Sequence, residues 1–245
     1  MDRVIYIAMT GARDVTRQQA VVSHNLANVS TQGFKQELNV FRALPVVGPG
    51  ARTRAYVAET TPRSDLTSGA IQHTGRPLDV AVQGQGWIAV QDAAGKEAYT
   101  RMGNLNVSMN GILQTTGGLN VLGDGAPLAV SPDQEILVAK DGTVSTVPLG
   151  QGLNQVTIAG RIKLVNPQET DLVRGDDGLF RQNNSQPAAA DANVQLISGA
   201  LEMSNVNPAE TLVNMVSLAR HFEMNMQVLR SAEQNHQSAD KVLSA

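Results

Sequence analysis

The chain has 245 residues, of which 42% are hydrophobic, so a folded body with a sizeable core and one or two domains is expected. Its net charge of −3 provides no basic surface, which argues against nucleic acid and favours protein partners. The absence of cysteine excludes disulfides, thiolate metal sites and cysteine nucleophiles. Aromatic residues make up only 3%, which favours helix packing and thin β-layers over aromatic ligand pockets.

The opening residues, MDRVIYIA, lack the long apolar segment of a signal peptide, and no run of about 18 apolar residues occurs in the sequence. We therefore expect no Sec targeting, no cleaved signal peptide and no direct membrane insertion.

Residues 1–34 predict a helix that ends in a sharp turn. Apolar or small residues recur every three or four positions, which defines one narrow helical face. These residues are Ile5, Ala8, Ala12, Val15, Val22, Leu26 and Val29, with Gln19 as a polar interruption. Asn28 and Gly33 tolerate a left-handed backbone and therefore end the helix, after which Phe34 provides an apolar anchor.

The middle of the chain predicts an extended connector followed by an antiparallel β-domain. Residues 35–77 are rich in proline and glycine and show no sustained period, which is typical of a connector. Residues 78–203 contain short β-branched runs separated by turns, and this is the pattern of antiparallel strands. The expected turns contain Gly95, Gly111, Gly142 and Gly178.

Residues 204–245 predict a second, longer helix with a well-marked start. Asn207 is placed as the N-cap, Pro208 occupies the first helical position and Glu210 the third, as in a capping box. The apolar face of this helix contains Leu212, Met215, Ala219, Phe222, Met226 and Leu229. The predicted fold class is therefore α+β, with a coiled-coil-type pair of terminal helices and a β-rich middle.

Each terminal helix needs a partner, because an isolated helix with a narrow apolar face is marginally stable in water. The simplest arrangement pairs the two terminal helices and leaves their other faces to neighbouring subunits, which would generate a helical filament or tube. On pattern alone, the alternative is an ordinary α+β domain with both helices laid on its sheet.

Three parts of the sequence together resemble the flagellar rod and hook protein family. Residues 23–35 (SHNLANVSTQGFK) are similar to its N-terminal signature, and residues 204–210 (SNVNPAE) with residues 220–225 (RHFEMN) to its C-terminal signature. Residues 76–82 (RPLDVAV) and 98–104 (AYTRMGN) resemble its central β-domain. Within the family, the opening segment and residues 220–224 look most like a proximal rod protein, with the distal rod protein as the alternative.

The resemblance implies a structural subunit that self-assembles through its terminal helices and transmits torque from the motor to the distal rod and hook. The expected partners are copies of itself, other rod proteins and the flagellar type III export apparatus. The implied location is the basal-body rod in the periplasmic space. The terminal segments would be disordered in the free subunit and would become ordered on assembly.

No catalytic or cofactor-binding pattern is expected, and we expect no enzyme activity, no cofactor, no metal and no small-molecule substrate. The four histidines, His24, His73, His221 and His236, lack the spacing of metal ligands. Asp65 and Asp79 could form a hydrolytic pair only if the fold brought them to one cleft. The corresponding alternative is a secreted β-protein that binds or cleaves glycans.

Overall fold

A computed structural model describes residues 2–45, 55–59, 63–131, 134–148, 156–184 and 186–243. The chain divides into two compact units. The helical unit contains residues 1–29, 36–65 and 206–245, and the β-body contains residues 30–35 and 66–205. The fold is α+β with antiparallel strands, which confirms the class predicted from the sequence.

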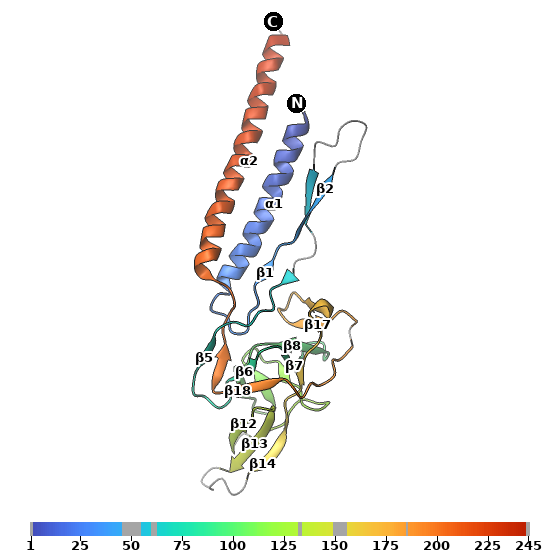
Figure 1. The fold of residues 1–245 in the computed structure, drawn as a ribbon, viewed down its shortest axis with the longest axis vertical. Helices are drawn as coiled ribbons and strands as arrows, with labels where there is room; N and C mark the ends of the chain where they lie inside the picture. The colour runs from blue at the N-terminus through green and yellow to red at the C-terminus, as the bar shows by residue number, and fades with distance from the viewer. Residues whose placement is uncertain are drawn as a thin grey trace. The chain divides into compact units, whose positions relative to one another are not determined.

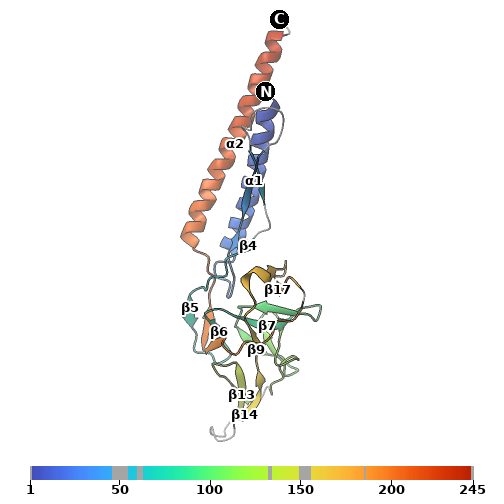
Figure 2. The ribbon, with the colours of Figure 1, turned by 45° about the vertical axis from the view of Figure 1, so that its right-hand side comes forward.

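Two long helices dominate the helical unit. Helix α1 (Asp2–Ala27) and helix α2 (Pro208–Leu243) pack side by side and run in opposite directions (Figures 1 and 2). Helix α2 is the longer, with 36 residues against 26 in α1. Neither helix, nor any other in the described part of the chain, is long and apolar enough to cross a membrane.

Short paired strands accompany the helices in the helical unit. Strand β1 (Glu37–Leu38) pairs with β4 (Arg63–Ser64), and β2 (Phe41–Pro45) pairs with β3 (Ala55–Glu59) over five residues on each side. Strand β3 also contacts α1. The segment predicted as an extended connector thus contains backbone-paired strands, although its residues 46–54 and 60–62 lie outside the described ranges.

The described part of the β-body contains an eight-stranded antiparallel sheet. Seven of its strands follow the order β16-β17-β8-β7-β11-β10-β9, and the eighth, β15, also pairs with β7. The bounds of these strands are β7 Trp87–Gln91, β8 Glu97–Thr100, β9 Leu105–Val107, β10 Leu113–Thr115, β11 Asn120–Val121, β15 Leu164–Val165, β16 Leu172–Arg174 and β17 Phe180–Gln182. A short 3-10 helix, Glu169–Asp171, precedes β16.

Smaller sheets complete the β-body. Strands β12 (Gln134–Val138), β13 (Thr143–Pro148) and β14 (Thr157–Arg161) form a three-stranded antiparallel sheet. Strand β18 (Gln195–Ser198) pairs with β6 (Val80–Gln83), and β19 (Ala200–Glu202) pairs with β5 (Ile71–His73). The last two pairings join residues that are more than a hundred positions apart in sequence.

Aliphatic side chains fill the core of the β-body. Val80, Ile88, Val90, Leu105 and Leu113 are completely buried in one cluster, which collects the inward faces of several strands. Each fully buried aliphatic side chain of this kind contributes about 1.5–3 kcal/mol to folding. The β-body therefore has a core of its own and does not depend on the helices to bury its strands.

A second cluster contains three of the eight aromatic residues of the chain. The rings of Trp87 and Phe180 lie 4.5 Å apart in a tilted arrangement, and Tyr99 is buried beside them. The Tyr99 hydroxyl accepts a hydrogen bond from the backbone N–H of Ala188 and donates one to Glu97. Burial raises the pKa of Tyr99 to about 12, so this hydroxyl keeps its proton at neutral pH.

An arginine on β17 connects two hairpin turns at the surface. The Arg181 guanidinium lies 2.8 Å from a carboxylate oxygen of Asp92 and 2.6 Å from one of Asp177. Hydrogen bonding to Arg181 holds the pKa of both carboxyl groups below the ordinary value. Because both pKa values are depressed in the folded state, this stabilisation is present at neutral pH and is lost as the pH falls through the carboxyl range.

The four glycines expected in turns all adopt a positive φ, which confirms the turn positions predicted from the sequence. The φ angles are 79° at Gly95, 73° at Gly111, 86° at Gly142 and 77° at Gly178. Because side chains disfavour this backbone region, glycine is the residue that permits these tight reversals.

Helix α2 begins with the capping arrangement for which its sequence is suited. The Asn207 side-chain oxygen accepts hydrogen bonds from the backbone N–H groups of Ala209 at 3.1 Å and Glu210 at 3.4 Å. The backbone N–H groups of the first turn have no acceptor within the helix, so the Asn207 side chain provides one for these two.

Replacing the cap tests its contribution. We expect Asn207→Ala to destabilise the first turn of α2 by about 1 kcal/mol, because two backbone donors lose their acceptor. Asn207→Asp is the matched control, since its carboxylate accepts the same bonds and suits the positive end of the helix dipole. Amide exchange at Ala209 and Glu210 should accelerate in the first variant only, and equal exchange rates in both variants would contradict this role of the cap.

A glycine inside the β-body provides a second test. A Cβ atom added at Gly103 would lie 1.6 Å from the Val80 carbonyl oxygen, whereas one added at Gly117 would have 3.7 Å to its nearest neighbour. We expect Gly103→Ala to lower the free energy of unfolding by about 2 kcal/mol or more, because backbone must move. Gly117→Ala should leave it almost unchanged in urea denaturation, and similar losses in both variants would show that the close approach is unimportant.

Candidate assembly interface

The contact between α1 and α2 is built from small residues on α1. Ala8 and Ala12 are buried, and Gly11 lies so close to α2 that an added Cβ atom would be 3.2 Å from the Asn225 side-chain oxygen. Small side chains let two helices approach closely, and a polar residue at such a contact favours one register. The contact between Gly11 and Asn225 therefore helps to set the register of α1 against α2.

The residues predicted for the interface lie at three levels of exposure. Half-buried in the helical unit are Ile5, Val15, Val22, Leu26, Asn28, Met215, Met226 and Leu229. Leu212, Ala219 and Phe222 are exposed, although they continue the same predicted face. Gly33 and buried Phe34 belong to the β-body, where they follow the turn after α1. The cap residues Asn207, Pro208 and Glu210 are exposed at the start of α2.

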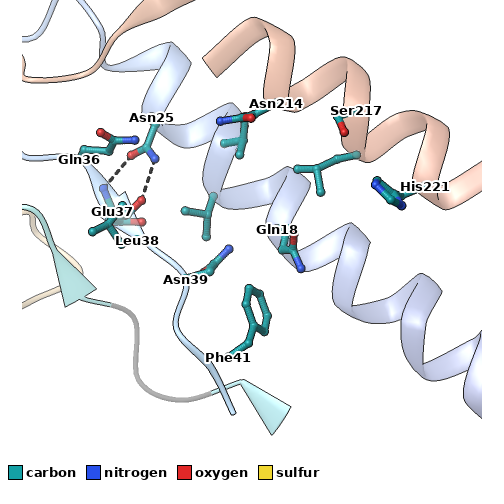
Figure 3. Close-up of a pocket in the computed structure, with 13 residues that line it drawn as sticks. Gln18, Asn25, Gln36, Glu37, Leu38, Asn39, Phe41, Asn214, Ser217 and His221 are labelled. Carbon is teal, nitrogen blue, oxygen red and sulfur yellow. Dashed lines mark hydrogen bonds between the residues drawn. The ribbon is translucent and has the colours of Figure 1, made fainter. Parts of the chain in front are cut away.

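Asn25 joins the end of α1 to the strand segment beside it. Its side-chain N–H donates to the Glu37 carbonyl oxygen at 2.9 Å, and its side-chain oxygen accepts from the Glu37 N–H at 2.9 Å (Figure 3). His24 adds a contact of 3.3 Å between its Nδ1 atom and the Glu37 carboxylate. Asn25 is buried, so both hydrogen bonds are partly shielded from water, and they hold Glu37 against the helix.

A pocket with a volume of about 400 Å³ lies between α1, residues 36–41 and α2. Amide side chains from all three parts, including Gln18, Asn39 and Asn214, line it together with His221 (Figure 3). Apolar side chains such as Val22 and Leu218 complete its wall. The helical unit thus combines an apolar helix contact with a layer of hydrogen-bonding side chains.

Other apolar side chains of the helices are not covered within the subunit. On α2, Val213 is 69% exposed, and Val216 and Met224 are each more than half exposed. On α1, Tyr6 and Met9 are also more than half exposed. Apolar side chains that recur in this way along exposed helical faces are characteristic of surfaces that contact another protein.

The sequence pattern missed several residues that form the helix contact and its surroundings. Gly11, Asp14, Asn25 and Asn225 lie buried or close-packed there, although their polarity or small size excluded them from an apolar pattern. A signal was present for Asn25, because it lies three residues after Val22 and next to Leu26 on the predicted face. Polar residues can therefore occupy buried positions on a helix face that is otherwise apolar.

Two of the residues weighed for chemistry, Asp79 and His24, have structural partners. Asp79 is buried and accepts hydrogen bonds from Thr74 and Arg76, and His24 contacts Glu37. The described ranges of the chain contain no group of three or more histidine, aspartate or glutamate side chains that could hold a metal ion.

Three family models each match a different part of the chain. "Flagella basal body rod protein" matches residues 5–35, "Flagellar hook protein FlgE/F/G D1 domain" matches residues 81–146, and "Flagellar basal body rod FlgEFG protein C-terminal" matches residues 197–242. These matches cover both terminal helices and much of the β-body.

Curated relatives align with the chain over its whole length. It is 45% identical to flagellar basal-body rod protein FlgF of Salmonella typhimurium and 44% identical to FlgF of Escherichia coli, covering 100% of this chain and 99% of each relative. Identity to flagellar basal-body rod protein FlgG of Buchnera aphidicola is 30%, covering 94% of this chain and 95% of that protein. The chain therefore belongs to the family of flagellar basal-body rod proteins and is a structural component of the flagellar basal body.

Proposed function

We propose that this chain is a subunit of the proximal flagellar rod that polymerises through its paired terminal helices. The proposal rests on one observation. Helices α1 and α2 cover one face of each other, yet apolar side chains on both helices remain exposed. A rod is a polymer of subunits, and these uncovered faces are the surfaces on which neighbouring helices can pack.

The positions of the exposed apolar residues favour a head-to-tail contact. Tyr6 and Met9 lie near the beginning of α1, whereas Val213 and Val216 lie near the beginning of α2. Because the helices are antiparallel, these two groups lie toward opposite ends of the helix pair (Figure 1). A contact between unlike ends of successive copies repeats from copy to copy, and it produces a helical polymer when the rotation between copies does not close a ring.

The same arrangement explains how torque would pass along the rod. Close-packed helices transmit strain because their side chains interlock and compress little. The rod subunit would bind copies of itself and the neighbouring rod proteins, and carry torque from the motor to the distal rod and hook. It would reach the periplasmic part of the basal body through the flagellar type III export apparatus.

The proximal rod is favoured over the distal rod by relative similarity. Identity to two FlgF proteins is 44–45%, against 30% to a FlgG protein of comparable coverage. Complementation decides between these positions, because a proximal subunit should restore swimming only to a strain that lacks its own proximal protein. The glycan-binding alternative has less support, since the carboxylate of Asp79 is engaged by Thr74 and Arg76.

A charge placed on the outward face of α2 tests the polymer contact. We expect Val213→Asp to leave the subunit folded and exported, because this side chain is 69% exposed and a charge there remains in water. Assembly should fail, since a neighbouring helix would have to bury the carboxylate at a cost of several kcal/mol. Swimming in soft agar should be lost while the exported subunit is still detected.

The control places the same charge on the β-body. Met109 is fully exposed in the turn between β9 and β10, so Met109→Asp should fold, be exported and support swimming. Normal swimming of the Val213→Asp strain would overturn the proposal that this face of α2 is an assembly surface.

A further inference from the structure

The polypeptide passes between the helical unit and the β-body four times. The crossings fall between residues 29 and 30, 35 and 36, 65 and 66, and 205 and 206. Within the β-body, the chain next to these crossings consists of three segments, residues 30–35, 66–70 and 202–205. These three segments are far apart in sequence, yet one group of buried side chains joins them.

Glu202 is the centre of this group. One of its carboxylate oxygens lies 2.7 Å from Lys35 Nζ and accepts a second hydrogen bond, of 2.9 Å, from the Gly69 backbone N–H. The other oxygen lies 2.8 Å from the Arg101 guanidinium. The side chains of all three charged residues are at most 2% exposed, so the contacts are shielded from water.

The two cations also bind backbone oxygens. Lys35 Nζ donates to the Thr67 carbonyl oxygen at 2.7 Å, and Arg101 donates to the Gly84 carbonyl oxygen at 2.7 Å. The Arg101 guanidinium lies 5.3 Å from the centre of the Trp87 ring, which belongs to the aromatic cluster of the β-body. The charged group is thereby attached to the rigid core.

Further contacts hold the same three segments. The Gly33 N–H donates to the Glu202 carbonyl oxygen at 2.8 Å, and the Asn205 side chain donates to the Thr67 carbonyl oxygen at 3.2 Å. Arg174 donates to the Lys35 carbonyl oxygen at 3.1 Å and lies 4.6 Å from the centre of the Phe34 ring. Phe34, predicted as an apolar anchor, is therefore packed within the β-body.

Two glycines show how closely these segments approach each other and the backbone that carries Arg101. A Cβ atom at Gly33, where φ is +67°, would lie 2.4 Å from the Arg101 backbone carbon. A Cβ atom at Gly69 would lie 2.0 Å from the Met203 carbonyl oxygen. The backbone at Gly69 is thus in direct contact with residues 203–204, and the backbone at Gly33 with residues 101–102.

We propose that Glu202, Lys35 and Arg101 form a joint that gathers the three segments at one place on the β-body, whether or not the terminal helices are paired. Glu202, Lys35 and Arg101 all belong to the β-body, and the bonds described above join residues of that unit. The joint fixes the points from which both terminal segments leave the body. The idea that the joint is needed for rod assembly rests on the proposed function, whereas the existence of the joint does not.

Charge is better suited to this task than an apolar contact. A buried ion pair adds little net stability compared with apolar packing, because its desolvation cost offsets the attraction. It does impose direction, since a carboxylate accepts bonds only at defined positions around its two oxygens. Glu202 uses those positions for three donors from three different parts of the chain, so its charge specifies which segments meet.

The test uses the full-length monomer and amide exchange followed by NMR. Glu202→Gln keeps the shape of the side chain but leaves two buried cations without their anion. We expect the Gly33 and Gly69 amides to exchange about 10- to 100-fold faster, while amides of β7 and β8 keep their protection. Glu169→Gln, at an exposed glutamate of the β-body, is the matched control and should change neither group.

Lys35→Met provides a second variant if Glu202→Gln does not fold, because it removes one cation and leaves the Glu202–Arg101 pair intact. It should accelerate exchange at Gly33 and Gly69 with the same selectivity. Unchanged exchange at these two amides, or acceleration spread evenly over the β-body, would overturn the joint.

Swimming assays separate the two proposals. Faster exchange confined to Gly33 and Gly69, together with reduced swimming, supports both the joint and its role in assembly. The same selective exchange with normal swimming overturns the role in assembly but not the joint or the rod function. The rod function itself is tested independently by the Val213→Asp variant, which lies outside the joint.

Discussion

The need to cover the apolar face of a long helix determines the organisation of this protein. A single amphipathic helix is marginally stable in water, and most of its stability in a protein comes from packing. Helices α1 and α2 satisfy this need for each other on one side only. The apolar side chains that remain exposed, such as Val213 and Met9, are the part of the requirement that a single subunit does not meet.

The β-body is built on a different principle. Its aliphatic core is fully buried within the unit, and its buried charges have partners within the unit as well. It can therefore keep its structure while the terminal helices exchange one environment for another. This separation agrees with the proposed assembly through the terminal helices, since only the helices would need new contacts in the polymer.

Local signals in the sequence were sufficient for the helices, the turns and the fold class. The cap at Asn207, the spacing of apolar residues and the Gly-containing turns each depend on a few neighbouring residues, so one sequence reveals them. The strands between residues 37 and 64 were missed because their pairing depends on partners across the connector and not on a sustained period. The same holds for the bond between Lys35 and Glu202, which are 167 positions apart.

The sequence pattern did not show which predicted interface residues contact the partner helix and which remain exposed. Leu212 and Phe222 continue the apolar period of α2, yet both are exposed, since one partner helix covers only one side of α2. Gly11 and Asn225 meet at the helix contact without being apolar, so hydrophobic periodicity could not identify them. Which residues of a helix face its partner depends on the helix crossing, and this is determined by packing between distant segments.

The pairing of α1 with α2 of the same subunit is tested most directly by a disulfide between positions 11 and 225. The chain has no cysteine, so Gly11→Cys with Asn225→Cys introduces a single pair, and a Cβ at position 11 lies 3.5 Å from the Asn225 side-chain carbon, within reach of a disulfide. After mild oxidation of assembled rods, non-reducing electrophoresis should show cross-linked monomers. A pair of Gly11→Cys with Val213→Cys should remain reduced. A ladder of dimers and larger species from the first pair, or no cross-link at all, would contradict helix pairing within one subunit.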